Sequence, residues 1–146
     1  AAMWADWWGF KMEAYDAINE NIPLVHKAGG CAIVHSDDAN GIQRLNQEAA
    51  KALADGRRIG IDVADEVAWT WQSYNPAKAL GIEDKTGSLK PGKMADVVLW
   101  NGNPLSVYAR PDKVWIDGAL MFDAADPKRR PVSDFELGQP GEGDVK

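Results

Sequence analysis

The segment from Ala32 to Asp38 holds the first residues whose types and order could do chemistry. An apolar run, Ala32-Ile33-Val34, is followed by polar residues and ends in two carboxylates, Asp37 and Asp38. An acid at the carboxyl end of a strand is how α/β barrels present catalytic groups, because their active sites lie at that face. Asp37 is therefore a candidate catalytic residue. A carboxylate here could equally cap the following turn or helix, so both interpretations stay open from spacing alone.

His35 and Asp37 are two positions apart, and strand residues at that spacing share a face. If Asp37 points into a barrel mouth, His35 points inward one layer deeper. There it is either a hydrogen-bonded interior histidine, or a side chain that pairs with Asp37 or, if Asp37 binds a metal, lies close to that metal. Asp38 is expected to be a cap or loop residue. Asn40, which precedes Gly41, is expected either to contact substrate or to serve turn chemistry only.

Three tryptophans, Trp4, Trp7 and Trp8, lie within residues 1–10, which we expect to form an aromatic-rich loop. They could wall a substrate entrance or simply pack together. The residues after them should position the strand that carries Asp37. Residues 11–28 are expected to be broadly helical, with Asn21 as a cap and Pro23 in the first turn, and Gly29-Gly30 should end the helix.

The first half then continues with helices. After a loop from Asp37 to Ile42, apolar residues recur at i, i+4, i+7 and i+8 from Leu45, which predicts a helix that stops at Gly56. A second helix is expected to start at Asp62 and to bury Val63, Val67 and Trp71 on one face. A short third helix should run from Asn75-Pro76 to Leu80, with Asn75 as its cap.

The second half is β-rich. A strand is expected over 95–100, and the segments 113–116 and 119–122 flank Asp117-Gly118, a strong signal for a two-residue hairpin turn. The domain boundary is predicted near residues 82–88, which gives two segments, 1–84 and 85–146. The last ten residues are polar and could be disordered. Gly87 to Lys93 imitates half of a phosphate-binding loop, but Met94 stands where Ser or Thr should follow, so we reject that function.

Composition excludes several classes. The chain has 146 residues and a formal net charge of -6. An acidic balance argues against nucleic acid and against an anionic membrane surface as partners, and no apolar run approaches the ~20 residues of a membrane span. A (β/α)8 barrel typically needs about 250 residues, so this chain is too short for a whole one. The lone Cys31 is expected to be a small buried residue rather than a reactive thiol.

A long ordered signature lies in the second half. It comprises Asn-Pro-Ala-Lys-Ala-Leu-Gly from Asn75, Gly-Ser-Leu-Lys-Pro-Gly-Lys-Met-Ala-Asp-Val-Val-Leu-Trp from Gly87, and Gly-Asn-Pro-Leu from Gly102. It resembles the C-terminal signature of the amidohydrolase superfamily, and most closely that of imidazolonepropionase- and prolidase-like enzymes. Val114 to Gly118 continues the likeness, which spans nearly the whole chain.

The resemblance implies an α/β fold: the last β/α units of a (β/α)8 TIM barrel, followed by the C-terminal strands of a small composite β-sandwich. It also implies a metal-dependent hydrolase of C–N bonds in a small-molecule substrate. Its divalent metal, expected to be zinc as one or two ions, is held in such enzymes by ligands on strands one, four, five, six and eight. Only the last ligand, an Asp, has a match in this chain, at Asp37.

The resemblance gives Asp37 two roles, as metal ligand and as proton shuttle. A divalent metal lowers the pKa of bound water from about 16 toward 7, and a carboxylate beside it can accept the proton and pass it to the leaving amine. The alternative function is a non-catalytic, truncated or split fragment with a structural role. One parallel strand with its helices leaves edges unpaired, so a companion chain or a homo-oligomer is expected.

Overall fold

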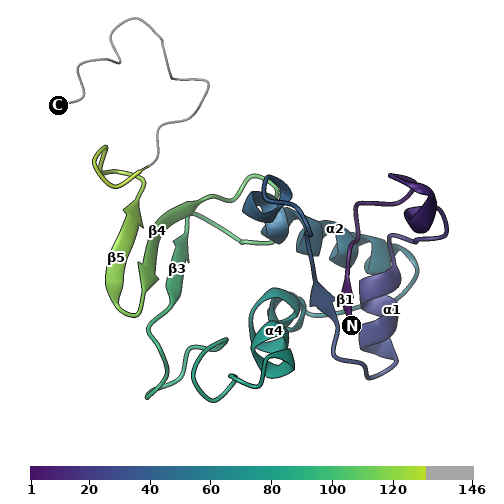
Figure 1. Cartoon of the computed structure of the whole chain (residues 1–146), viewed down its shortest axis with the longest axis horizontal. Coiled ribbons are helices and arrows are strands. Elements are labelled where there is room, and N and C mark those ends of the chain that lie inside the picture. Colours follow the sequence, from purple (N-terminus) through teal and green to yellow (C-terminus); the bar gives the residue numbers. More distant parts are fainter. Residues whose placement is uncertain (131–146) are drawn as a thin grey trace, which may run out of the picture.

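The computed structural model of the chain describes residues 1–130. Two groups of elements lie at opposite ends of the molecule, with β1, β2, α1 and α2 at one end, the sheet β3–β4–β5 at the other, and α4 between them (Figure 1). The chain is therefore an α/β structure. The helices are α1 (Asn21–Lys27), α2 (Leu45–Arg58), α3 (Asp65–Trp69) and α4 (Tyr74–Ala79), with the 3-10 turns η1 (Met12–Ala14), η2 (Gly41–Arg44) and η3 (Thr70–Gln72). The strands are β1 (Ala2–Met3), β2 (Ile33–Val34), β3 (Val97–Trp100), β4 (Pro111–Ile116) and β5 (Ala119–Asp123).

The first strand, β1, pairs in parallel with β2, and α1 lies between them in the chain. The Ile33 amide donates to the carbonyl oxygen of Ala1 at 2.9 Å, and the His35 amide donates to that of Met3 at 3.0 Å. The expectation of a loop over all of residues 1–10 is therefore wrong for β1. A strand of two residues is too short to show a periodic pattern, and only its distant partner makes it a strand.

The expected helix over 11–28 is present only in part. A 3-10 turn covers Met12–Ala14, and α1 begins only at Asn21. The Asn21 side chain does not cap in the expected way. Its Nδ2 donates to the carbonyl oxygen of Trp4 at 2.7 Å, which ties the start of α1 to the loop after β1. Pro23 lies in the first turn as predicted, and α1 ends before Gly29, which has a φ of 81°.

The predicted helix from Leu45 is confirmed as α2, whose apolar positions Ala49, Ala52 and Leu53 are buried. Gly56 does not stop it, because α2 continues to Arg58. Gly56 is instead buried where α2 crosses α1. A Cβ at Gly56 would lie 2.7 Å from Cβ of Pro23 and 2.9 Å from its Cγ. The missing side chain thus allows the two helices to approach closely.

We expect Gly56→Ala to destabilise the protein by about 1–3 kcal/mol, because the Pro23 ring is rigid and the helices must separate. Urea unfolding monitored by circular dichroism measures the change. Gly102→Ala is the matched control, since a Cβ at Gly102 would have no heavy atom within 4 Å. Equal midpoints for the two variants would refute the close-approach explanation.

Trp71 lies at the centre of the core and is fully buried. The core also contains Ile22, Ala32, Val34, Ala49, Ala52, Leu53, Ile61, Val63 and Ala68, with Leu105 packed against it from the β3–β4 connection. The expected helix start at Asp62 is wrong, because α3 begins at Asp65 with Ala64 as the preceding residue. Val63 and Trp71 are buried as predicted, whereas Val67 is 40% exposed.

The short helix α4 fits the prediction within about a residue, but Asn75 does not cap it. Asn75 lies inside α4, and its Nδ2 donates to the carbonyl oxygen of Ala32 at 2.8 Å. This bond connects α4 to the strand segment before Asp37. Cys31 is half-buried, and its Sγ lies 3.8 Å from the carbonyl oxygen of Asn75.

The strands β3, β4 and β5 form an antiparallel sheet in chain order. The predicted hairpin is confirmed. Asp117 and Gly118 both have positive φ, 50° and 81°, as a type I′ turn requires. The predicted boundary near residues 82–88 lies between α4 and β3. The last ten residues, 137–146, lie outside the described part. Within residues 1–130, no helix combines the length and apolar character needed to cross a membrane.

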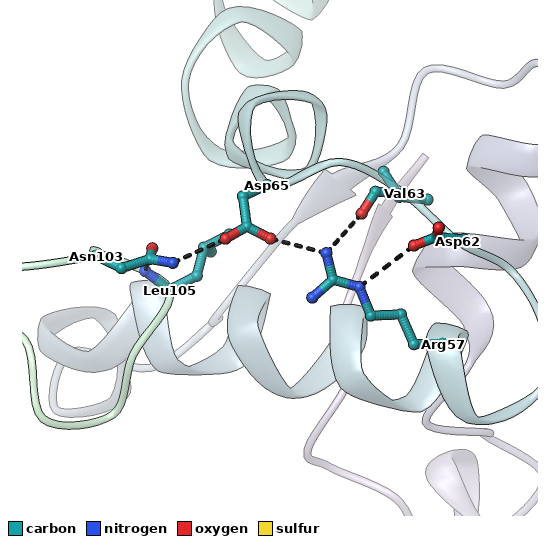
Figure 2. A network of polar contacts seen from close by, with 6 residues as sticks. All are labelled: Arg57, Asp62, Val63, Asp65, Asn103 and Leu105. Carbon is teal, nitrogen blue, oxygen red and sulfur yellow. Dashed lines mark hydrogen bonds and ion pairs between the residues drawn. The ribbon is translucent and has the colours of Figure 1, made fainter.

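A polar network joins the β3–β4 connection to the helices (Figure 2). Arg57 of α2 donates to Asp65 Oδ1 and to the carbonyl oxygen of Val63, both at 2.8 Å, and Asn103 Nδ2 donates to Asp65 Oδ2 at 2.7 Å. Nearby, Asn46 Nδ2 donates to the carbonyl oxygen of Pro104 at 2.9 Å. The hydrogen bond from Arg57, and then that from Asn103, hold the pKa of Asp65 below its ordinary value.

This lowered pKa predicts a pH effect on stability. Ionised Asp65 stabilises the fold above the unfolded-state pKa, and that contribution is lost as pH falls through the lower folded-state pKa. Asp65→Asn should cost less than about 1 kcal/mol near neutral pH, because the pair is partly exposed. The cost should shrink as pH falls through the lowered folded-state pKa. Urea unfolding at a series of pH values from neutral into the acid range, with exposed Glu66→Gln as control, measures this; a cost that is independent of pH would contradict it.

Candidate functional site

The candidate site lies at the carboxyl ends of β1 and β2. Because β1 and β2 are parallel, the loops that follow them leave the sheet at the same end, the carboxyl end of the strands. The loop after β1 carries Trp4, Asp6 and Trp7, and the loop after β2 carries His35 and Asp37. Residues of these two loops, which are about 30 positions apart in the sequence, therefore meet at one end of the sheet.

Asp37 is exposed and has a φ of 51°. Left-handed backbone is uncommon for residues other than glycine, although Asp tolerates it better than most. Among residues 1–130, only Asp37 and Asp117 combine a side chain with positive φ. Conformations of this kind gather at turns and at functional sites. The arrangement leaves the Asp37 carboxylate accessible at the strand end.

Asp38 organises the turn that follows. Its Oδ2 accepts a hydrogen bond from the Gly41 amide, and its carbonyl oxygen accepts one from Ser36 Oγ at 3.0 Å. The expectation that Asp38 is a cap or loop residue is confirmed. Capping, which was one of the two interpretations open for Asp37, is thus the role of its neighbour Asp38.

His35 is half-buried and its ring stacks on Trp4, with centroids 5.6 Å apart and planes 20° from parallel. The sequence offered either a hydrogen-bonded interior histidine or a group near a metal, and the role of His35 stays a prediction. Its contact with Trp4 has a further consequence, because it links the strand that leads to Asp37 with the loop after β1.

The other three residues that were predicted to contact substrate lie in different surroundings. Trp7 joins an aromatic group, with its ring centroid 6.0 Å from Trp4 and 4.6 Å from Phe10. Trp8 is 63% exposed and projects away from the core. Asn40 is exposed at the start of η2, without a side-chain capping bond. Contact of Trp7, Trp8 and Asn40 with substrate stays a prediction.

Glu48 is a site residue that the sequence reasoning missed. It lies in the first turn of α2, is only 6% exposed, and accepts a hydrogen bond from Trp7 Nε1 at 3.1 Å. Burial raises the pKa of Glu48, and the hydrogen bond from Trp7 partly opposes the shift. The signal was present, because Glu48 follows Leu45 by three positions and so interrupts the apolar stripe of the predicted helix.

A small polar cavity of about 190 Å³ adjoins Glu48. Both loops and the start of α2 contribute to its wall, which is lined by Asp6, Trp7, Asp38, Gly41, Arg44, Gln47, Glu48 and Lys51. Lys51, one turn along α2 from Glu48, forms an ion pair with Asp6. The wall of this cavity beside the strand ends thus contains both acidic and basic side chains.

A divalent metal at this site would need several donor side chains. Asp37 supplies an accessible carboxylate oxygen, a ligand type that zinc accepts. Within the described part of the chain, however, no three side chains of His, Cys, Asp or Glu converge as a metal site requires. The described residues therefore fit one ligand of such a site and not a complete set.

Comparisons with known proteins agree on one family. The profile of the amidohydrolase family matches residues 17–124. Amidohydrolase tasK of Hapsidospora irregularis is 34% identical over 84% of this chain, and N-acetylglucosamine-6-phosphate deacetylase of Vibrio furnissii is 40% identical over 48%. The crystal structure of an amidohydrolase from Thermotoga maritima matches 77% of the chain with a TM-score of 0.63 and 34% identity. The chain spans 12% and 16% of the two relatives and 28% of the solved structure.

Proposed function

Because the chain belongs to the amidohydrolase family, we propose that it supplies the C-terminal part of a metal-dependent hydrolase that cleaves C–N bonds. The observation that carries the proposal is the accessible Asp37 at the carboxyl end of β2, where it stands in left-handed backbone. The short share of each relative that the chain covers supports the restriction to one part of the enzyme.

In this proposal the β1–α1–β2–α2 order forms the last β/α units of a (β/α)8 barrel. Two parallel strands with a helix between them are the repeating unit of such barrels. Residues 1–84 are the barrel segment, and residues 85–146 contribute to a small β-sandwich through β3, β4 and β5. The likeness to the solved amidohydrolase supports this assignment.

Asp37 is proposed to hold and move a proton. Its carboxylate accepts a proton from the attacking water and then donates it to the nitrogen of the leaving amine, so that one group serves as base and later as acid. It is also one ligand of a divalent metal, expected to be zinc, which when bound supplies a more acidic water. Within the described residues, no set of three potential ligands forms around Asp37.

The substrate class is proposed from the bond that is cleaved. A relative whose name is a deacetylase cleaves an amide, and cyclic amides, acylated amino acids and dipeptides share that chemistry. The aromatic group beside the strand ends is proposed to form one wall of the site for such a small substrate. Trp7 packs against Trp4 in this group, whereas Trp8 is 63% exposed.

A second candidate function is a structural part that acts only within an assembly. It is favoured by exposed apolar side chains, notably Leu80 at 74% and Leu89 at 77%, which line a hollow of about 560 Å³ with Met94 and Val98. Large exposed apolar patches mark surfaces that another chain covers. A companion chain or a homo-oligomer is therefore part of the proposal.

An amine-release assay tests the proposal. The longest natural form of the protein that carries this chain is incubated with cyclic amides, N-acyl amino acids and dipeptides, and free amine is quantified. We expect release from at least one class. No release from any of them, by folded protein supplied with zinc, would favour the structural role instead. Sedimentation analysis of the same sample measures whether it assembles.

A further inference from the structure

Glu48 and Lys51 tie one face of α2 to two consecutive residues of the loop after β1. Glu48 accepts the indole N–H of Trp7, and Lys51 pairs with Asp6. The Glu48 carboxylate is nine-tenths buried, and within the described residues its Oε2 has no hydrogen-bond partner. Burying a carboxylate this incompletely paired is costly, so an apolar residue would serve packing better.

A chain of ring contacts leads from that tie toward Asp37. Trp7 packs against Trp4 at 6.0 Å, and Trp4 stacks on His35 at 5.6 Å. His35 lies two residues before Asp37 on the same strand exit. The aromatic group of Trp4, Trp7 and Phe10 is therefore linked, through the stacking of Trp4 on His35, to the segment that leads from β2 to Asp37, and Glu48 binds this group at Trp7.

We propose that Glu48 is a positioning residue: through Trp7 and Trp4 it holds the aromatic group that forms the substrate wall beside Asp37. This inference rests on the proposed hydrolase function. A wall of indole rings favours apolar or planar groups on the substrate. Glu48 does not touch the reacting atoms, so its loss should weaken substrate binding far more than it slows the chemical step.

Kinetics of four variants and one control variant test the proposal. Glu48→Ala should raise KM about tenfold, the loss expected for one charge-assisted hydrogen bond, with kcat nearly unchanged. Trp7→Phe removes the same bond and also alters the wall, so it should raise KM at least as much, and the double variant should be no worse than Trp7→Phe alone. Glu48→Gln keeps an acceptor and should restore KM. Gln43→Ala, exposed just before α2, is the control. Wild-type KM in Glu48→Ala, or multiplied effects in the double variant, would overturn the proposal.

A second measurement needs no substrate and so separates this inference from the proposed function. Indole N–H signals in NMR spectra of the same protein are assigned through Trp7→Phe and Trp4→Phe. In Glu48→Ala, the Trp7 signal should shift and exchange faster with water, and the Trp4 signal and the His35 ring signals should move with it. If only Trp7 changes, Glu48 does not position the wall, whether or not the protein hydrolyses anything.

Discussion

Asp37→Asn is expected to lower kcat/KM for amide hydrolysis by about 10³-fold or more while leaving the fold intact. Asparagine has nearly the same shape and tolerates left-handed backbone as Asp does, so the turn after β2 should survive. It cannot accept the proton of an attacking water at neutral pH, and general acid–base groups contribute about 10²–10⁴-fold. The proposed role of Asp37 as an anionic metal ligand would add to that effect. Steady-state rates and thermal unfolding of the same samples measure both consequences.

Asp38→Asn is the matched control, because the two acids are adjacent. Asp38 accepts the Gly41 amide, and the asparagine carbonyl can accept it too, so we expect a change in rate of less than about tenfold. Rates for Asp37→Asn within tenfold of wild type would remove Asp37 from the mechanism. A larger loss in Asp38→Asn than in Asp37→Asn would place the catalytic carboxylate one residue later.

Trp71→Ala is expected to produce the largest loss of stability of any substitution considered for this chain. Its side chain is fully buried among residues from α1, α2, β2 and α3, and its indole N–H donates to His26 Nδ1 at 3.4 Å. Removing a buried aromatic ring costs about 3–5 kcal/mol, because the cavity collapses only in part. Denaturant unfolding measures the free energy of unfolding directly.

Trp8→Ala provides the comparison for this prediction. The same atoms are removed, but from a side chain that is 63% exposed, so a change within about 0.5 kcal/mol is expected. Similar losses in both variants would mean that the core does not centre on Trp71. Trp71→Phe should fall between the two, since it keeps a ring in the cavity.

The sequence predicted the elements whose signals are local. The apolar spacing from Leu45 predicted α2, and Asp117-Gly118 predicted the hairpin because both positions must adopt positive φ. The change in polarity after Val34 predicted a strand that ends before Asp37, and β2 (Ile33–Val34) is present there, although its pairing with β1 was not predictable. For α2 and the hairpin, the residues of the element itself contain the physical reason, so no distant partner had to be known.

Elements and contacts that depend on distant partners were not predictable. β1 exists through hydrogen bonds to residues about 30 positions away, which no pattern in residues 1–10 encodes. The position of Glu48 on the apolar stripe of α2 is visible in the sequence, but its partner Trp7 is 41 positions away and was not predictable. Asp62 has the residue type of a helix cap, but α3 starts only at Asp65. The segment before α3 is extended, and Arg57 contacts it through an ion pair with Asp62 and a hydrogen bond to the carbonyl oxygen of Val63.

The β3–β4 connection contacts α2 and α3, although α4 and β3 separate it from these helices in the sequence. The peptide link between α4 and β3 runs through residues 80–96, whereas Leu105, Asn103 and Pro104 contact the helices from beyond β3. These contacts form a second attachment that does not pass through the link. The helix that follows the Asp37 loop and the sheet β3–β4–β5 are therefore joined both by the peptide chain and by side-chain contacts.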